Sequence, residues 1–448
     1  MKKDVIQLSD HFSYARLIRF VIPSVVMMIF TSIYGVVDGL FVSNFVGKTP
    51  FAAINLIFPL IMILGGFGFM LGTGGTAIVA KTLGMGEKKL ATEYFTFIII
   101  STTVMGSVLS VLGILLARPV AMLLGADGEM LECAVTYSRI VLLALPFFML
   151  QNSFQNFFIT AERAKLGLVV TVAAGVTNMV LDALFIAVLD WGLVGAAAAT
   201  ATSQFVGGII PVIYFASKNK SILRFCKTRP YWRVLLNACI NGSSELLSNI
   251  SASIVTILYN FQLLRFAGND GLAAYGVIMY VAFVFVAIFI GFVIGASPIV
   301  SFHYGAGNTD ELQSLRKKST RIVLVAGAAM LGVATLLSTT LCTLFVGYDA
   351  ELYQMTLRGF VIYAFSYLFA GFNIFGSSFF TALNNGGVSA VISFLRTLVF
   401  QTSTVILLPM LFPNSPIDGV WISVIVAELL SFVVTYAFIV VKRKKYNY

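Results

Sequence analysis

Residues 23–47 read PSVVMMIFTSIYGVVDGLFVSNFVG, a long apolar run that carries one carboxylate, Asp38, and one phenol, Tyr34. A carboxylate near the centre of a membrane-spanning helix costs about 2.5 kcal/mol or more, so an acid there usually has a function. A second run, residues 166–189, carries Asn178 and Asp182 in the same way. The simpler alternative is that Asp38 has no function and its side chain extends to the nearer membrane–water interface. Asp38 lies closer to the end of its run than to the middle, which would allow this.

The composition places the chain among multi-pass membrane proteins. Of its 448 residues 59% are hydrophobic and only 11% are charged, and the mean hydropathy is +0.95. Long apolar runs separated by charged loops explain these values, whereas a soluble core needs far less apolar surface. The net charge of +10 comes mostly from short loops. We therefore expect the lipid bilayer, and no nucleic acid, as the partner of the basic residues.

Twelve apolar runs are long enough to cross a membrane. They cover residues 17–44, 51–80, 91–117, 131–158, 166–189, 193–217, 233–265, 272–303, 319–346, 352–382, 387–412 and 418–441. Most of the 29 lysines and arginines fall in the loops on one side, together with both chain ends. Because positive loops stay in the cytoplasm, we expect both termini there. The first run has no small-residue cleavage site after it, so we expect it to be retained as a helix.

The sequence repeats itself after 221 residues. Phe45-Val46-Gly47 returns as Phe266-Ala267-Gly268, and Gly84-x-Gly86 returns as Gly305-x-Gly307. Near the chain end the shift grows by three residues and places Gln204 on Glu428. The sequence therefore predicts an all-α membrane protein of two six-helix bundles related by a parallel internal repeat. The predicted domains are an N-lobe over 1–217, a cytoplasmic linker over 218–232 and a C-lobe over 233–448.

The polar residues of the first half are predicted to meet at one depth. Asn178 and Asp182 share a helix face, as do Tyr34 and Asp38, because each pair is four residues apart. Both acids and Thr200 lie roughly 10 Å from the outer ends of their runs. These oxygen groups suit a proton or a hard cation such as Na⁺, and the residues do not choose between the two. The alternative is a cluster of hydrogen-bonded side chains whose only role is to hold the helices together.

Other polar residues at membrane depth are weaker candidates. They could line a cavity that receives substrate, or they could pair helices: Gln151, Gln155, Glu245 and Asn373. Among them Glu245 is an acid near the middle of its run and is a candidate contact for a cationic substrate. Glu428 and Arg396 are also at membrane depth, and the sequence shows no obvious partner for either.

The sequence shows no arrangement typical of an enzyme. It contains no P-loop, HExxH or GxSxG, and its four cysteines have no CxxC spacing. We therefore expect a protein that is not an enzyme, needs no cofactor and binds no metal other than Na⁺ at Asp38, Asn178 and Asp182. A membrane-embedded enzyme should have shown clustered catalytic residues.

Together these features resemble the multidrug and toxic compound extrusion (MATE) transporters. The resemblance rests on the two six-helix halves, the motifs Tyr34-x-x-x-Asp38 and Asn178-x-x-x-Asp182, the two glycine repeats, and Gly192-Leu-Val-Gly195 opening the sixth run. It covers essentially the whole chain and is greatest for the prokaryotic branch with a cation site in the N-terminal lobe.

The resemblance implies a V-shaped molecule with a central cleft, functional as a monomer in the plasma (inner) membrane. It implies outward antiport of organic cations and amphiphilic drugs, driven by protons or sodium. By motif, Asp38, Asn178, Asp182 and Thr200 would form the cation site, with Tyr34 beside it. Another branch places essential acids in helices seven and ten, but run ten here has none and Glu245 lies nearer the start of its helix. The alternative function on the same fold is a flippase or exporter of a lipid-linked or other amphiphilic metabolite.

Overall fold

The computed structural model describes residues 6–448, and the regular structure of this part is entirely helical. Lipid offers no hydrogen bonds to the backbone, so an apolar chain satisfies its own N–H and C=O groups by forming helices. The elements are α1 (Tyr14–Phe45), α2 (Lys48–Gly84), α3 (Lys88–Leu123), α4 (Gly128–Leu143), α5 (Leu145–Thr160), α6 (Ala164–Asp182), η1 (Ala183–Val188), α7 (Gly192–Ala216), α8 (Trp232–Gly305), α9 (Thr309–Val346), α10 (Ala350–Ala364), α11 (Tyr367–Ala382), α12 (Gly386–Phe394), η2 (Leu395–Phe400), α13 (Gln401–Leu411) and α14 (Pro416–Tyr446).

These elements form twelve spans, as the apolar runs predict. Two spans are bent pairs, α4 with α5 at 54° and α10 with α11 at 47°. The 74 residues of α8 would extend about 110 Å, more than three times the thickness of a hydrocarbon core. Gly268 divides α8 with φ 60° and ψ −147°, a conformation that needs glycine. The break falls between the predicted runs 233–265 and 272–303, so α8 is two spans.

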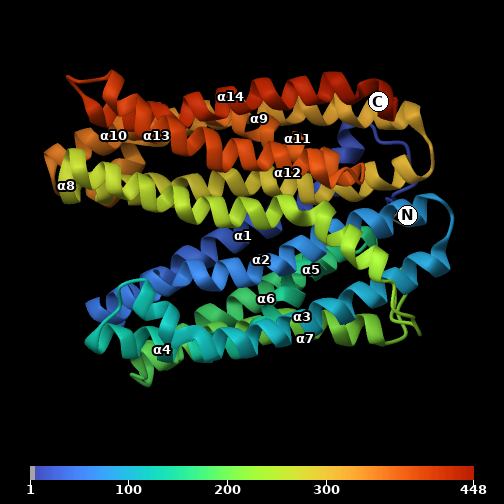
Figure 1. The fold of residues 1–448 in the computed structure, drawn as a ribbon, viewed down its shortest axis with the longest axis horizontal. Coiled ribbons are helices and arrows are strands. Elements are labelled where there is room, and N and C mark those ends of the chain that lie inside the picture. The colour runs from blue at the N-terminus through green and yellow to red at the C-terminus, as the bar shows by residue number, and fades with distance from the viewer. Residues whose placement is uncertain (1–5) are drawn as a thin grey trace.

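The spans form two bundles of six, shown one above the other in Figure 1. Helices α1–α7 make the N-lobe and α8–α14 the C-lobe. Each lobe has apolar clusters of its own, and a further cluster joins the first helix to the C-lobe. Both chain ends lie at the right of the view, where the lobes meet, and the ribbons diverge toward the opposite end (Figure 1).

Glycines allow the two lobes to touch backbone to backbone. A Cβ on Gly74 would lie 2.0 Å from the carbonyl oxygen of Ala238, and one on Gly242 would lie 1.9 Å from that of Met70. Nearer the chain ends the contact is reciprocal. A Cβ on Gly84 or Gly305 would lie 2.0 Å from a carbonyl oxygen of the other lobe. The repeated Gly-x-Gly motif therefore supplies one interlobe contact from each half.

The residues before α1 form an arm that binds both lobes; we call residues 6–13 the N-terminal arm. In the N-lobe, Glu162 Oε1 accepts a hydrogen bond from the Leu8 backbone N–H at 2.7 Å. In the C-lobe, Glu311 Oε1 accepts one from the Phe12 N–H at 2.9 Å, and Lys318 Nζ donates to the Phe12 carbonyl at 2.5 Å. The Leu8 and Phe12 side chains are buried among residues of both lobes. The arm therefore links the two lobes at this end of the molecule.

Removing the buried ring of the arm should loosen this end of the molecule. A phenylalanine-to-alanine change in a packed core costs about 3–5 kcal/mol, and here part of that energy holds the lobes together. The test uses a background in which Cys239, next to the interlobe contact at Ala238, is the sole cysteine. In this background we expect Phe12→Ala to raise the rate at which maleimide labels Cys239 about tenfold. Ile18→Ala, an apolar truncation at an exposed position of α1, is the control. Equal labelling of the two variants would show that the arm does not hold the lobes.

Candidate functional site

The centre of the site is the contact between α1 and α6. Gly175 leaves room on α6 for the rings of Phe30 and Tyr34, since a Cβ there would lie 2.5 Å and 2.8 Å from ring atoms of the two. Asn178 and Asp182 follow on the same buried face of α6. The glycine thus brings α1 close enough for Asp38 to lie beside both Asn178 and Asp182, with which its carboxyl group interacts.

Three of the four carboxylate oxygens of the two acids are buried without a hydrogen-bond donor among the described residues. Asp182 is 0% exposed, and both of its carboxylate oxygens are buried without a donor among the residues that the structure describes. Oδ1 of Asp38 is also buried without a donor among the described residues. Two adjacent carboxylates repel each other when both are ionised, and a buried acceptor without a partner costs free energy. A proton shared between the oxygens, or a cation bound by them, removes both penalties.

Two tyrosines complete the surroundings of the acids. The Tyr34 hydroxyl lies near Asp38 and interacts with the side chain of Gln151. Tyr137 of α4, 5% exposed, lies near both acids and interacts with Thr200 of α7. The structure therefore brings together the predicted residues Tyr34, Asp38, Asn178, Asp182 and Thr200. Tyr137 was not predicted, although counting inward from the outer end of run 131–158 puts it at the depth of Asp38.

The donor set suits a hard cation or a proton. It offers two carboxylates, an amide and hydroxyl groups, which are oxygen ligands of the kind preferred by Na⁺-like ions. No cluster of three or more His, Cys, Asp or Glu side chains able to hold a metal ion occurs among residues 6–448. The helix also departs from α-geometry here, because the π-helical turn η1 begins directly after Asp182. Such turns are frequent at functional sites.

Two of the four substrate-cleft candidates lie inside the N-lobe. Gln151 and Gln155 are 6% and 5% exposed and line a small cavity of ≈ 10 Å³ with Thr171, Gly207 and Pro211. That space fits about one water molecule. In this conformation the two glutamines therefore connect α5 to α6, α7 and Tyr34 and do not face the other lobe.

The other two candidates belong to the C-lobe and differ from each other. Glu245 lies three residues after Gly242 and four before Asn249, and both of these contact α2. Helical spacing therefore turns Glu245 toward the N-lobe. Asn373 is 0% exposed and donates to the Glu428 side chain at 2.7 Å, so it lies inside the C-lobe.

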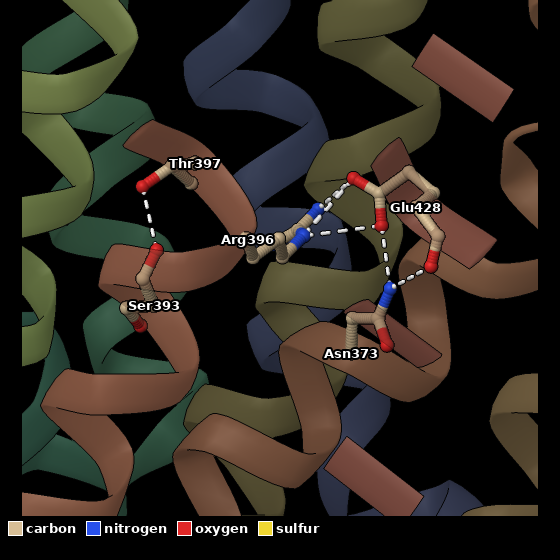
Figure 2. Close-up of polar contacts among 5 residues, drawn as sticks. All are labelled: Asn373, Ser393, Arg396, Thr397 and Glu428. Carbon is tan, nitrogen blue, oxygen red and sulfur yellow. Dashed lines mark hydrogen bonds and ion pairs between the residues drawn. The ribbon is translucent and has the colours of Figure 1, made fainter. Parts of the chain in front are cut away.

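The sequence showed no partner for Arg396 and Glu428, and the structure corrects this. They bind each other, with Arg396 Nη2 2.8 Å from Glu428 Oε1 (Figure 2). The two residues are 32 positions apart on different spans. Sequence patterns give depth, but they do not give the rotation of one helix against another, which decides this pairing.

Twelve spans in two lobes, with a pair of acids buried at membrane depth, define a polytopic membrane transporter. The MatE family model matches residues 23–184 and again residues 246–407. The chain therefore belongs to the MatE family of transporters and is not an enzyme. Because the model matches twice, in the same direction along the chain, the match also supports the parallel internal repeat.

Known relatives cover from about two thirds to nearly all of the chain. "Multidrug export protein MepA" of Staphylococcus saprophyticus is 23% identical over 425 residues, which are 92% of this chain and 90% of the relative. The protein of the same name in Staphylococcus haemolyticus is 24% identical over 322 residues, 71% of this chain and 70% of that one. A structure described as the outward-facing conformation of a multidrug resistance MATE family transporter matches with TM-score 0.93 at 21% identity, over 100% of this chain and 99% of that chain.

Proposed function

We propose that this chain is a secondary antiporter that exports organic cations or amphiphilic drugs while protons or sodium ions flow inward. The observation that carries the proposal is the pair Asp38–Asp182, whose buried oxygens lack donors in the described structure. Such a pair can take up and release one cation per cycle. The relatives called multidrug export proteins support the drug substrate. We expect small molecules as the only partners besides the bilayer, and a monomer as the working unit.

The transport cycle follows from the positions of the acids and the lobes. A proton or Na⁺ between Asp38 and Asp182 abolishes their repulsion and lets α1 pack differently on α6. Two positions of α1 favour bending: Pro23 lies inside the helix, and Gly35 has open space around it. We propose that this change in α1 alternates the lobes between two orientations.

We propose that both termini lie in the cytoplasm of a plasma-membrane protein, because the basic loops lie on the same side as the termini. The lobes then meet at the cytoplasmic end, through the N-terminal arm and the interlobe glycines, and diverge outward. On this orientation the conformation described above is outward-facing, and the arm opens when the transporter faces inward. Thiol-labelling of single cysteines added to the two ends, in sealed vesicles of known orientation, tests the topology.

The experiment that tests antiport uses purified protein in liposomes loaded with a fluorescent organic cation. A proton gradient and a sodium gradient are imposed separately. Movement of the fluorescent cation under one of them establishes antiport and names the ion. No movement under either, with folded protein, would contradict the proposal and favour a lipid-type substrate.

The flippase alternative receives less support from the C-lobe. An anionic head group needs a cationic group that faces it within the membrane. Arg396 is at membrane depth, but its guanidinium is bound to the Glu428 carboxylate. The charge that an anionic lipid would need is therefore already neutralised.

The carboxylate of Glu245 should favour positively charged substrates. We expect Glu245→Gln to raise KM for a monovalent organic cation about tenfold, because a hydrogen bond or ion contact to a charged group contributes about 1.5–3 kcal/mol. KM for a neutral amphiphile should change little. Glu129→Gln, the same change at an exposed position at the start of α4, is the control. An equal change of KM for charged and neutral substrates would contradict a charge-selecting role.

A further inference from the structure

The C-lobe contains a carboxylate, that of Glu428, both oxygens of which accept hydrogen bonds. Oε1 of Glu428 accepts from Arg396 Nε at 3.0 Å and from Nη2 at 2.8 Å. Oε2 accepts from Arg396 Nε at 3.1 Å and from Asn373 Nδ2 at 2.7 Å. Figure 2 shows the guanidinium and the amide converging on the carboxylate from two sides. Three N–H groups therefore point at the carboxylate, with the Nε–H shared between its two oxygens, so each oxygen has a donor.

Three elements hold this arrangement in place. Arg396 is carried by the π-helical turn η2, Asn373 by α11 and Glu428 by α14. Asn373 is anchored a second time, because its Nδ2 also donates to the Glu428 backbone carbonyl at 2.9 Å. Glu428 is 3% exposed, and the side chain of Arg396 is 18% exposed. The pair is therefore built into the lobe, with Glu428 buried and Arg396 largely buried.

The N-lobe acids are the opposite case. Asp182 is equally buried, yet both of its oxygens lack a donor in the described structure. The acids of the two lobes lie at positions that are not equivalent in the repeat, because Asp38 corresponds to Tyr259 and Glu428 to Gln204. One lobe thus holds carboxylates that need an external cation, and the other holds a carboxylate with a cation supplied by the chain.

We propose that Arg396 is a tethered cation that occupies a cation site at Glu428, so that this site is masked and coupling ions exchange only in the N-lobe. Loss of the guanidinium would unmask the site, and Glu428 would then take up a proton or a sodium ion from outside. The part of this inference that concerns coupling rests on the proposed antiport. The masking itself rests on the geometry alone.

The other titratable groups close to Glu428 are phenols. Tyr259 of α8 and Tyr363 of α10 lie near it, and the Tyr259 hydroxyl is bound to Ser423 Oγ at 2.6 Å. Phenols are neutral at physiological pH and do not replace a cation. Arg396 is therefore the cation that faces Glu428, with Asn373 as a neutral donor.

The masking is tested with N,N′-dicyclohexylcarbodiimide, an apolar reagent that modifies protonated carboxyl groups, followed by peptide mass spectrometry. In the wild type we expect modification at Asp38 or Asp182 and none at Glu428. An opposite charge within about 4–6 Å changes the proton equilibrium of a carboxyl group by about ten- to a thousandfold. Arg396→Met should therefore raise modification of Glu428 at least about tenfold. Arg396→Lys, which keeps a cation, should retain most of the protection.

Two outcomes would overturn the proposal. One is modification of Glu428 in the wild type to the level of the N-lobe acids, and the other is an unmodified Glu428 in a folded Arg396→Met protein. If Arg396→Met does not fold, the wild-type comparison of Glu428 with Asp182 in one sample still decides. The double variant Arg396→Met/Glu428→Gln shows whether an unpaired carboxylate caused the misfolding. The labelling measures no transport, so its result is independent of whether antiport occurs.

Discussion

Replacing Asp38 by asparagine is expected to lower gradient-driven export about 100-fold while leaving the protein folded. Coupling between two ligands is typically about 1–3 kcal/mol, or 5–150-fold, and the substitution removes one of the two groups that bind the coupling ion. The amide has the size of the protonated carboxyl group and can donate to Asp182, whose oxygens lack donors. The variant should therefore resemble the protonated state permanently, with equal or higher thermal stability.

The measurement is uptake or release of a fluorescent organic cation by proteoliposomes under a proton or a sodium gradient. Asp182→Asn should show a loss of similar size, and the double variant should be little worse than either single one, because the two acids act as a unit. Asp270→Asn makes the same chemical change at an exposed position and should keep full activity. Wild-type rates for Asp38→Asn would place the coupling site elsewhere.

Most of the fold could be predicted because a bilayer leaves a chain few options. Every span must satisfy its own backbone hydrogen bonds, so apolar length alone locates the helices. The bends within spans were harder to predict. The bends between α4 and α5 and between α10 and α11 lie within runs that the sequence gives as continuous. The glycine break at Gly268 coincides with a gap between runs and was easier to place.

The candidate site could be predicted in part. The spacing of four residues along one helix predicted that Asn178 and Asp182 share a face. Their distance from the outer end of their run predicted that they lie at the same membrane depth as Asp38. Contacts between different spans depend on helix rotation, which hydropathy does not report. For that reason Tyr137 was missed. The sequence left open whether Gln151 and Gln155 line a cavity or pair helices, and in the structure they line a small cavity inside the N-lobe. The N-terminal arm was missed because residues 6–13 have no periodic pattern; their role depends on Glu162 and Glu311, far away in the sequence.

Adding one methyl group to Gly242 is expected to separate the lobes at the end where they meet. A Cβ at this position would lie 1.9 Å from the Met70 carbonyl oxygen and 3.0 Å from the Gly74 nitrogen. Both are backbone atoms, which cannot rotate away as a flexible side chain could. Overpacking of this kind costs about 1–3 kcal/mol. Gly242→Ala should therefore change the balance between this conformation and one with the lobes apart by about 5–150-fold.

Spin labels at Lys89 and Asp310 report the separation, since both residues are exposed at the starts of α3 and α9, one in each lobe. Double electron–electron resonance should show longer distances for Gly242→Ala than for the parent. Gly276→Ala, on the same helix but with open space around the glycine, should leave the distances unchanged. A transporter held in one orientation completes few cycles, so export by Gly242→Ala should fall as well. If the distances are unchanged and export is normal, the lobes do not need the close contact at Gly242 and Gly74, and the arm together with the reciprocal contact at Gly84 and Gly305 must hold them instead.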